Sequence, residues 1–268
     1  MATIKSLHQI TPLIESTRPL QWPGKVFFKM DALQPSGSFK IRGIGNRCQK
    51  AVREQGCQHF ISSSGGNAGM AVAYSGRALG VPVDVVVPTP TESFMIDKLE
   101  ALGARVTKYG DIWNEAHAYA TDLQTKSSDS VLIHPFEHND TWDGHASIIS
   151  ETAEQLREMN EPKPSGVVTC VGGGGLLTGV MRGMERVGWD KVPVYACETE
   201  GAASFALATS KEEIQGSKQG ELNVPSLDSI TSMAKSLGAL QVHFLGSSPV
   251  YRLSDFSLTL SDMRRIYI

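Results

Sequence analysis

Short apolar runs alternate with helical stretches along most of the chain. Buried strands are predicted at residues 25–30, 59–64, 82–88, 104–109, 130–135, 166–172 and 192–198. Helices are predicted between them at 67–79, 92–102, 112–125, 145–159 and 176–187. This alternation predicts an α/β protein with mostly parallel sheets. In such sheets, ligands bind where the carboxyl ends of strands meet the amino ends of helices.

Length, composition and charge exclude several classes of function. The 268 residues, 41% of them hydrophobic, suffice for one large domain or two modest ones. A net charge of −3 and a pI near 6.2 provide no positive surface, so neither nucleic acid nor a membrane is an expected partner. The chain begins without the apolar run of a signal peptide, so we expect it to be cytoplasmic. Its four cysteines are widely spaced and form no CxxC motif, which favours free thiols.

The segment QPSGSFKIRG, residues 34–43, places a lysine directly after a turn. Pro35 and Gly37 mark the turn, and Ser38 is a candidate N-cap, so Lys40 is expected in or near the first turn of a helix. The positive end of a helix disfavours a cation by up to about 1 kcal/mol. The same field lowers the pKa of an amine and favours the neutral nucleophile. The simpler alternative is a basic surface cluster of Lys40 with Arg42.

Two glycine-rich turns connect a predicted strand to a predicted helix. The first contains Ser64, Gly65 and Gly66, and its helix begins near Asn67. The second is the run 172–175, which matches neither a Walker loop nor a dinucleotide-binding motif. Unpaired N–H groups at a helix start bind anions, so the first turn suits a carboxylate or phosphate and the second a phosphate held by backbone amides. Close packing is the alternative for both.

Together these features describe a site for pyridoxal phosphate. The amine of Lys40 would form a Schiff base with the aldehyde, the phosphate would lie on the second turn, and the ring of Phe39 would lie against the cofactor.

The segments QPSGSFKIRG, SSSGGNAGMAVAY, WDGHASI and VGGGGLLTGVMRGM carry a family resemblance. In order and spacing, over about residues 8–240, they resemble the L-serine dehydratases, also called L-threonine deaminases, which are fold-type II pyridoxal-phosphate enzymes. The resemblance implies a tryptophan synthase beta-like fold with two open, twisted, mostly parallel sheets flanked by helices. It implies a small domain at 39–138 and a discontinuous large domain at 1–38 and 139–268.

The resemblance also implies roles for individual residues. Lys40 would be the Schiff-base lysine and Phe39 the aromatic on the cofactor ring. The substrate carboxylate would bind at Ser64, Gly65, Gly66 and Asn67, with Asn67 also near the ring hydroxyl. The phosphate would bind at Gly172, Gly173, Gly174, Gly175 and Leu176. A monovalent cation such as K⁺ would bind at Glu198 and Ala202.

The implied reaction is the β-elimination and deamination of a small amino acid by a homodimer. L-Serine would give pyruvate and ammonia, and L-threonine would give 2-oxobutanoate, with Lys40 removing the Cα proton. Two alternatives stay open. One is a serine or aspartate racemase of the same fold, and the other is a catalytically impaired isoform that binds cofactor or dimerises.

Two departures from the family pattern affect these expectations. Gly65 replaces an alanine, which removes a methyl group beside the substrate and leaves the serine and threonine preference and the balance with racemisation open. From Val242 onward the sequence does not resemble the family, and the strand that supplies the pyridine-nitrogen partner is expected to be missing. Ser247 and Ser248 are not expected to replace it.

Two histidine features are expected to have structural roles rather than roles in metal binding or catalysis. His134 and His138 have the spacing of a metal-binding pair, but Pro135 disfavours a regular helix there and a third ligand is not evident. His145 is expected at a helix start, as a packing or hydrogen-bonding residue rather than an acid–base catalyst.

Overall fold

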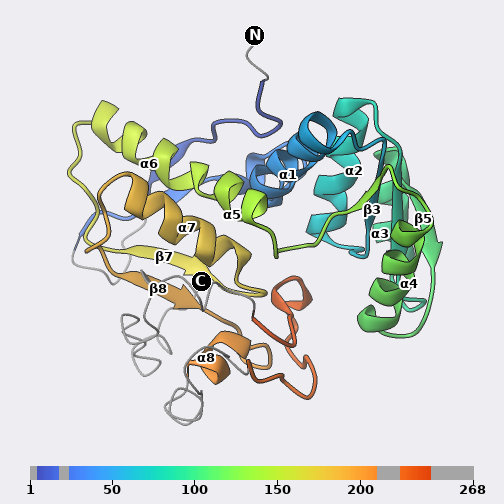
Figure 1. Ribbon diagram of the computed structural model, residues 1–268. Coiled ribbons are helices and arrows are strands. Elements are labelled where there is room, and N and C mark those ends of the chain that lie inside the picture. The colour runs from blue at the N-terminus through green and yellow to red at the C-terminus, as the bar shows by residue number, and fades with distance from the viewer. Residues whose placement is uncertain (1–4, 18–23, 210–223, 243–268) are drawn as a thin grey trace, which may run out of the picture.

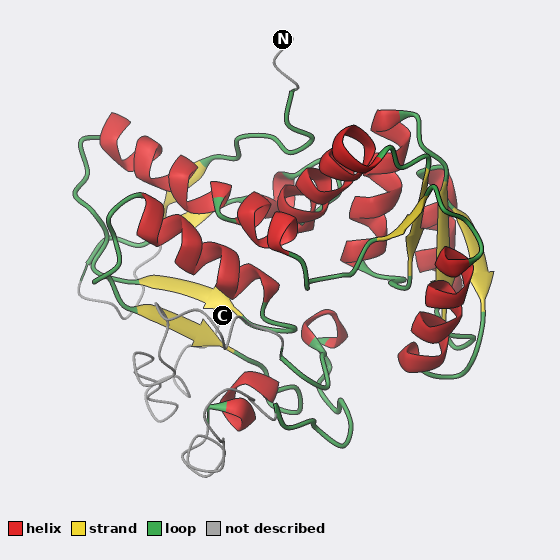
Figure 2. Cartoon of the chain, viewed as in Figure 1, coloured by secondary structure: helices red, strands yellow, loops and turns green. Residues whose placement is uncertain are grey.

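The computed structural model describes residues 5–17, 24–209 and 224–242 (Figures 1 and 2). Its strands are β1 (Leu13–Glu15), β2 (Phe27–Lys29), β3 (His59–Ser62), β4 (Val83–Val87), β5 (Arg105–Lys108), β6 (Ser130–Leu132), β7 (Val167–Cys170) and β8 (Val194–Cys197). Its α-helices are α1 (Lys40–Gln55), α2 (Asn67–Leu79), α3 (Ser93–Ala101), α4 (Trp113–Thr125), α5 (Asn139–His145), α6 (Ser147–Glu158), α7 (Gly175–Arg186) and α8 (Ser204–Ala208). The short 3-10 helices η1 (Asp31–Leu33) and η2 (Lys235–Leu237) complete the described elements.

A four-stranded parallel sheet in the order β5-β4-β3-β6 forms one lobe. Successive side chains of a strand point to opposite faces, so Phe60 and Val85 pack with α1, α2 and α3. Ile61 and Val86 pack with α4 on the other face. Helices on both faces bury the sheet, which explains the uninterrupted apolar sequence of its central strands.

The second lobe contains the parallel pair β7 and β8, in which Cys170 lies opposite Cys197. Helices α6 and α7 share a core with residues of both strands. Helix α8 packs through Phe205 and Ala208 against Ala196 of β8. Strands β1 and β2 form a separate antiparallel pair.

Helices α1 and α5 lie between the two lobes, and α5 contacts both α1 and α7 (Figure 1). Glycines permit these close crossings. A Cβ on Gly43 would lie 2.5 Å from the His145 ring, and a Cβ on Gly144 would overlap the backbone of Arg42. Through α5, the crossings connect α1 to α7, the helix that follows the second glycine turn.

The α/β class with mostly parallel sheets is confirmed, and each predicted strand is found within its apolar run. The helix predicted at 145–159 is found as α6, and Ala146 separates it from α5. His145 therefore ends α5 rather than starting a helix, which corrects its predicted position.

Some predictions are not tested by this architecture. The boundaries of the small domain at 39–138 stay a prediction, although the whole four-stranded sheet comes from residues within it. The predicted incomplete ending, with Ser247 and Ser248, lies outside the described residues. In the part of the chain that is described, no helix has the length and apolar character needed to cross a membrane.

Candidate active site

Lys40 is the first residue of α1, as the sequence predicts. Its Nζ donates a hydrogen bond to the carbonyl oxygen of Pro135 at 2.7 Å. The same atom lies 5.4 Å from the ring centre of Phe39 and 5.9 Å from that of Phe136. Burial lowers the pKa of Lys40 from 10.5 to about 8, against a small opposing effect of Cys170. Burial is therefore the main cause of the lowered pKa.

Ser38 does not cap α1, which corrects the sequence prediction. The N-cap residue is Phe39, in helical conformation and without a side-chain cap. The hydroxyl oxygens of Ser36 and Ser38 are instead buried and have no hydrogen-bond partner among the described residues. An unsatisfied buried hydroxyl costs about 1–3 kcal/mol, so this pair of hydroxyls next to Lys40 is suited to a polar ligand.

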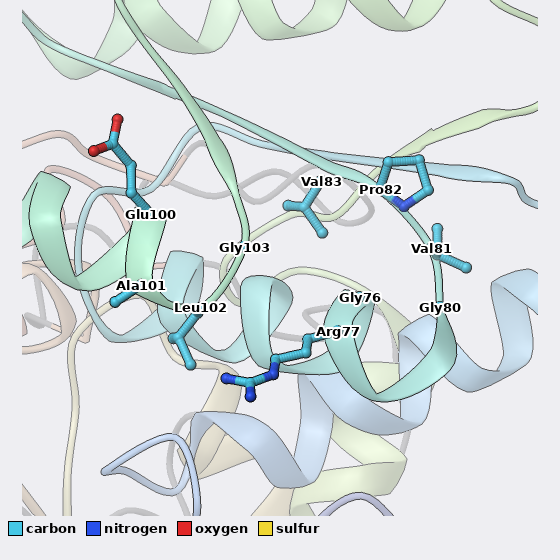
Figure 3. A pocket seen from close by; sticks show the side chains of 10 residues that line it. All are labelled: Gly76, Arg77, Gly80, Val81, Pro82, Val83, Glu100, Ala101, Leu102 and Gly103. Carbon is cyan, nitrogen blue, oxygen red and sulfur yellow. The ribbon is translucent and has the colours of Figure 1, made fainter.

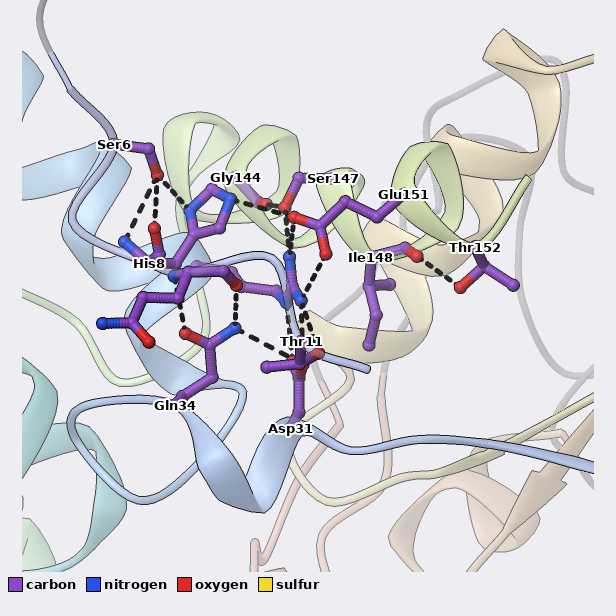
Figure 4. A network of polar contacts seen from close by, with 12 residues as sticks. Ser6, His8, Thr11, Asp31, Gln34, Gly144, Ser147, Ile148, Glu151 and Thr152 are labelled. Atoms are coloured by element: carbon purple, nitrogen blue, oxygen red, sulfur yellow. Dashed lines mark hydrogen bonds and ion pairs between the residues drawn. The ribbon is translucent and has the colours of Figure 1, made fainter. Parts of the chain in front are cut away.

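Arg42 is fully buried, which contradicts the alternative of a basic surface cluster. Its guanidinium bonds the carboxylate of Asp31 at 2.6 Å and that of Glu151 at 2.7 Å. Asp31 and Glu151 are labelled in the polar network of Figure 4. Burial opposes the charge on Arg42, but these two carboxylates raise its pKa above the ordinary value. Since Asp31 belongs to η1 and Glu151 to α6, the network holds the first turn of α1, and Lys40 with it, between two separate elements.

The first glycine turn lies between β3 and α2, and Gly66 is the N-cap residue of α2. The N–H of Ser64 donates to Ser62 Oγ at 3.3 Å, and the N–H of Gly66 donates to Ser64 Oγ at 3.3 Å. The N–H groups of Gly65 and Asn67 find no acceptor within the described chain. Asn67 is exposed. The turn therefore presents backbone donors at a helix start, which is the arrangement that binds carboxylates.

The methyl group that Gly65 lacks would point toward β4. A Cβ there would lie 3.1 Å from Val87 Cγ1 and 3.3 Å from the Thr91 methyl group. An alanine at this position would displace the end of β4 and Thr91. It would therefore affect a substrate at least partly by moving those neighbours.

The second glycine turn leads into α7, and close packing explains its glycines. Gly174 has φ of +86°, which favours glycine. A Cβ on Gly173 would lie 2.5 Å from the Phe136 ring, and one on Gly175 would lie 2.6 Å from the Phe136 carbonyl oxygen. The packing alternative is thus supported for these residues. Gly174, the N-cap residue, provides no side-chain cap, so the backbone amides at the start of α7 remain suited to a phosphate.

Pro135 and Phe136 bring Lys40 and the second turn together, since Pro135 bonds the lysine and Phe136 covers the glycines. Neither residue is predicted from the sequence as part of the site, because this segment stands out only by the spacing of His134 and His138. His138 instead caps α5 by accepting a bond from the Asp140 N–H at 3.1 Å, and no cluster of metal-ligating side chains occurs among the described residues.

His145 lies behind this site and is fully buried. Its ring contacts that of Phe39 edge to face, with centroids 5.2 Å apart. Burial, and then the charge of Lys40, keeps its pKa well below the ordinary value. His145 is therefore a neutral packing residue that supports Phe39.

Glu198 and Ala202 lie after β8, at the start of the segment that leads to α8. The carboxylate of Glu198 accepts hydrogen bonds of 2.8 Å from the N–H groups of Phe205 and Ala206, and so caps α8. Burial raises the pKa of Glu198. Ala202 is fully buried. The carboxylate is a cap in this structure, and the cation site stays a prediction.

A separate surface pocket lies at the amino edge of the four-stranded sheet (Figure 3). It is lined by the ends of α2 and α3 and by the first residues of β4, so it lies at the amino edge of the sheet, away from Lys40. Arg77 and Glu100 are its charged residues. The pocket shares no residue with the two glycine turns.

Comparison with known proteins identifies the family. Residues 4–245 match the family described as pyridoxal-phosphate dependent enzyme. This chain belongs to that family. The mouse L-serine dehydratase/L-threonine deaminase is 43% identical over 267 residues, which are 99% of this chain and 77% of that protein.

Solved structures show the same fold-type II architecture. A fungal L-serine ammonia-lyase from Rhizomucor miehei matches with a TM-score of 0.75 and 32% identity, over 89% of this chain and 71% of that one. A maize serine racemase matches with a TM-score of 0.73 and 24% identity, over 87% of this chain and 66% of that one, and shows the fold alone.

The residues present fit the cofactor of this family. A buried amine with a lowered pKa lies beside an aromatic ring, as imine formation requires. The backbone amides at the start of α7 provide neutral donors for a phosphate. The unpartnered hydroxyls of Ser36 and Ser38 provide further polar groups in the segment that leads to Lys40.

Proposed function

We propose that this chain catalyses the pyridoxal-phosphate-dependent β-elimination and deamination of L-serine, and of L-threonine, to pyruvate or 2-oxobutanoate and ammonia. The observation that carries the proposal is the buried amine of Lys40, with a pKa of about 8, beside Phe136 and the second glycine turn. The 43% identity to a mouse protein named L-serine dehydratase/L-threonine deaminase supports the choice of substrate class.

Each predicted residue has a task in this reaction. When bound, pyridoxal phosphate supplies a conjugated ring that accepts the electrons of the broken Cα–H bond. The amides of residues 172–176 would hold its phosphate, and Phe39 would lie against its ring. The N–H groups of the turn 64–67 would hold the substrate carboxylate and orient the Cα–H bond.

Lys40 carries the proton transfer. Its pKa near 8 leaves a useful fraction of neutral amine at physiological pH, which an exposed lysine does not have. To reach the substrate, Nζ must leave the Pro135 carbonyl, its present hydrogen-bond acceptor. The rings of Phe39 and Phe136 exclude water on two sides of the amine and keep its pKa low.

Under this proposal the chain acts as a cytoplasmic homodimer on a small amino acid, with residues 39–138 as its small domain. The proposal also includes a monovalent cation at Glu198 and Ala202. The buried carboxylate of Glu198 and its raised pKa are the features that a bound cation would offset.

The test combines labelling with product analysis. Purified chain is incubated with pyridoxal phosphate, reduced with borohydride and digested, and the labelled peptide is identified by mass spectrometry. We expect the label on Lys40, 2-oxo acid release from L-serine, and a loss of about 10³-fold or more in Lys40→Ala. D-Serine without 2-oxo acid would establish the racemase instead, and labelling without any turnover would establish the impaired isoform. Absence of a label on Lys40 in folded protein would overturn the cofactor assignment.

A further inference from the structure

Four aromatic rings form a continuous row beside the two glycine turns. This ring row consists of Trp113, His117, His134 and Phe136. Trp113 stacks on His117 with ring centroids 4.6 Å apart, and His117 meets His134 edge to face at 5.6 Å. His134 in turn meets Phe136 edge to face at 4.7 Å. Each ring therefore fixes the orientation of the next.

The ring row follows the carboxyl edge of the four-stranded sheet. Trp113 and His117 belong to α4, which follows β5, while His134 and Phe136 follow β6. This is the edge at which parallel sheets bind ligands. At one end of the row, Phe136 covers the second glycine turn and lies 5.9 Å from Lys40 Nζ.

The middle of the row reaches the first glycine turn through Ser63. The Nδ1 atom of His117 lies 2.8 Å from Ser63 Oγ, and Ser63 is fully buried. Among the described residues, His117 is the partner found for this hydroxyl. Ser63 directly precedes Ser64, where the turn begins. The hydrogen bond therefore fixes the end of the strand from which the turn departs.

The ring of His117 is suited to a permanent hydrogen bond with Ser63. Burial lowers its pKa, so the ring is neutral at physiological pH, and the stacked Trp113 prevents it from turning away. The neutral ring forms a hydrogen bond with Ser63 and brings no charge next to the turn.

We infer that His117 is a positioning residue for the substrate carboxylate, and that it acts through Ser63 on the backbone N–H groups of residues 64–67. The inference rests on the proposed function, because that function assigns the carboxylate to this turn. None of the contacts described for His117 involves Lys40. Its loss should therefore weaken substrate binding rather than slow the chemical step.

The experiment is a double-mutant cycle on the cofactor-loaded enzyme. His117→Phe keeps a ring in the row and removes the hydrogen bond, and Ser63→Ala removes the other partner. We expect KM for L-serine to rise about tenfold in either variant and by no more in the double variant, with kcat within about twofold. Tyr119→Phe is the matched control, because Tyr119 is on the same helix but stacks on Tyr109. It should leave KM unchanged.

Hydrogen exchange provides a readout that does not depend on turnover. Without cofactor, the amides of residues 64–67 should exchange faster in His117→Phe and in Ser63→Ala than in the wild type, and at the wild-type rate in Tyr119→Phe. If His117→Phe does not fold, Ser63→Ala alone carries the comparison.

The outcomes separate this inference from the proposed function. An active wild type whose KM and exchange rates are unchanged by His117→Phe would overturn the inference and leave the function intact. An inactive wild type would overturn the function. In that case faster exchange at residues 64–67 would still support the link from His117 to the turn, and unchanged exchange would overturn it too.

Discussion

The two glycine turns contain glycine for different physical reasons. In the second turn, neighbouring atoms exclude a side chain whether or not a ligand is bound, since Phe136 lies against both Gly173 and Gly175. In the first turn Gly65 is also closely packed, but a Cβ on Gly66 would meet only Ser64 Oγ, at 4.0 Å, and the φ of Gly66 is −103°. A run of glycines thus indicates tight packing as readily as ligand binding. Gly66, where the neighbouring atoms leave room for a side chain, is the more direct indication of a ligand.

The largest effect should come from Gly175→Ala. Its Cβ would lie 2.6 Å from a backbone oxygen that cannot rotate away, so we expect about 1–3 kcal/mol of destabilisation. In a chain of this size that lowers Tm by about 2–4 °C per kcal/mol. The measurement is thermal denaturation of the cofactor-free protein. An unchanged Tm there would show that packing does not explain this glycine.

Gly66→Ala should impair substrate binding and leave stability almost unchanged. We expect the free energy of unfolding to change by less than about 0.5 kcal/mol, because the position has room and an ordinary φ. KM for L-serine should rise about tenfold, because the methyl group hinders approach to the backbone N–H groups. Urea denaturation and steady-state kinetics on the same preparation decide this. A stability loss as large as that of Gly175→Ala would remove the contrast between the turns.

A third experiment examines the contact between Gly173 and Phe136. Gly173→Ala should be destabilising in the wild type and less so in a Phe136→Leu background, since the smaller side chain makes room for the methyl group. We expect a coupling of about 1 kcal/mol between the two substitutions in denaturant unfolding. Additive effects would mean that the ring does not enforce glycine here.

A last prediction concerns the pH dependence of stability. The folded pKa of Lys40, about 8, is below its unfolded value of 10.5, so the unfolded chain binds more protons between these values. The contribution of Lys40 to stability therefore increases as pH rises from about 8 to 10, by about 1–3 kcal/mol. Urea unfolding of cofactor-free wild type and Lys40→Met across this range should show the rise only in the wild type. Parallel curves would contradict a lowered pKa.

Local features of the fold were predictable from the sequence, because they depend on neighbouring residues. Each apolar run gave a strand, and the turn at Pro35 and Gly37 placed Lys40 at a helix start. Strand β1 and the helices α5 and α8 were missed. β1 has three residues and α5 has seven, too few to show a period.

The parts of the site that depend on distant residues were not predictable. Ser38 has the right type and position for a cap, but its hydroxyl is buried instead. Phe136 acts through contacts with Lys40 and Gly173, and His117 through Ser63. Trp113 is 38% exposed and stacks on His117. These pairings depend on the packing of α4 and the segment after β6 at one sheet edge.

The glycines at which α5 crosses its neighbouring helices should tolerate almost no substitution. Gly43, Gly144 and Gly179 admit no side chain, because each faces a neighbouring helix at backbone distance. In a saturation library selected for growth, these positions would be as intolerant as Lys40, although none would touch the substrate. Scoring the same library for protein abundance would separate the two groups, since only the glycine variants would be depleted from the folded pool.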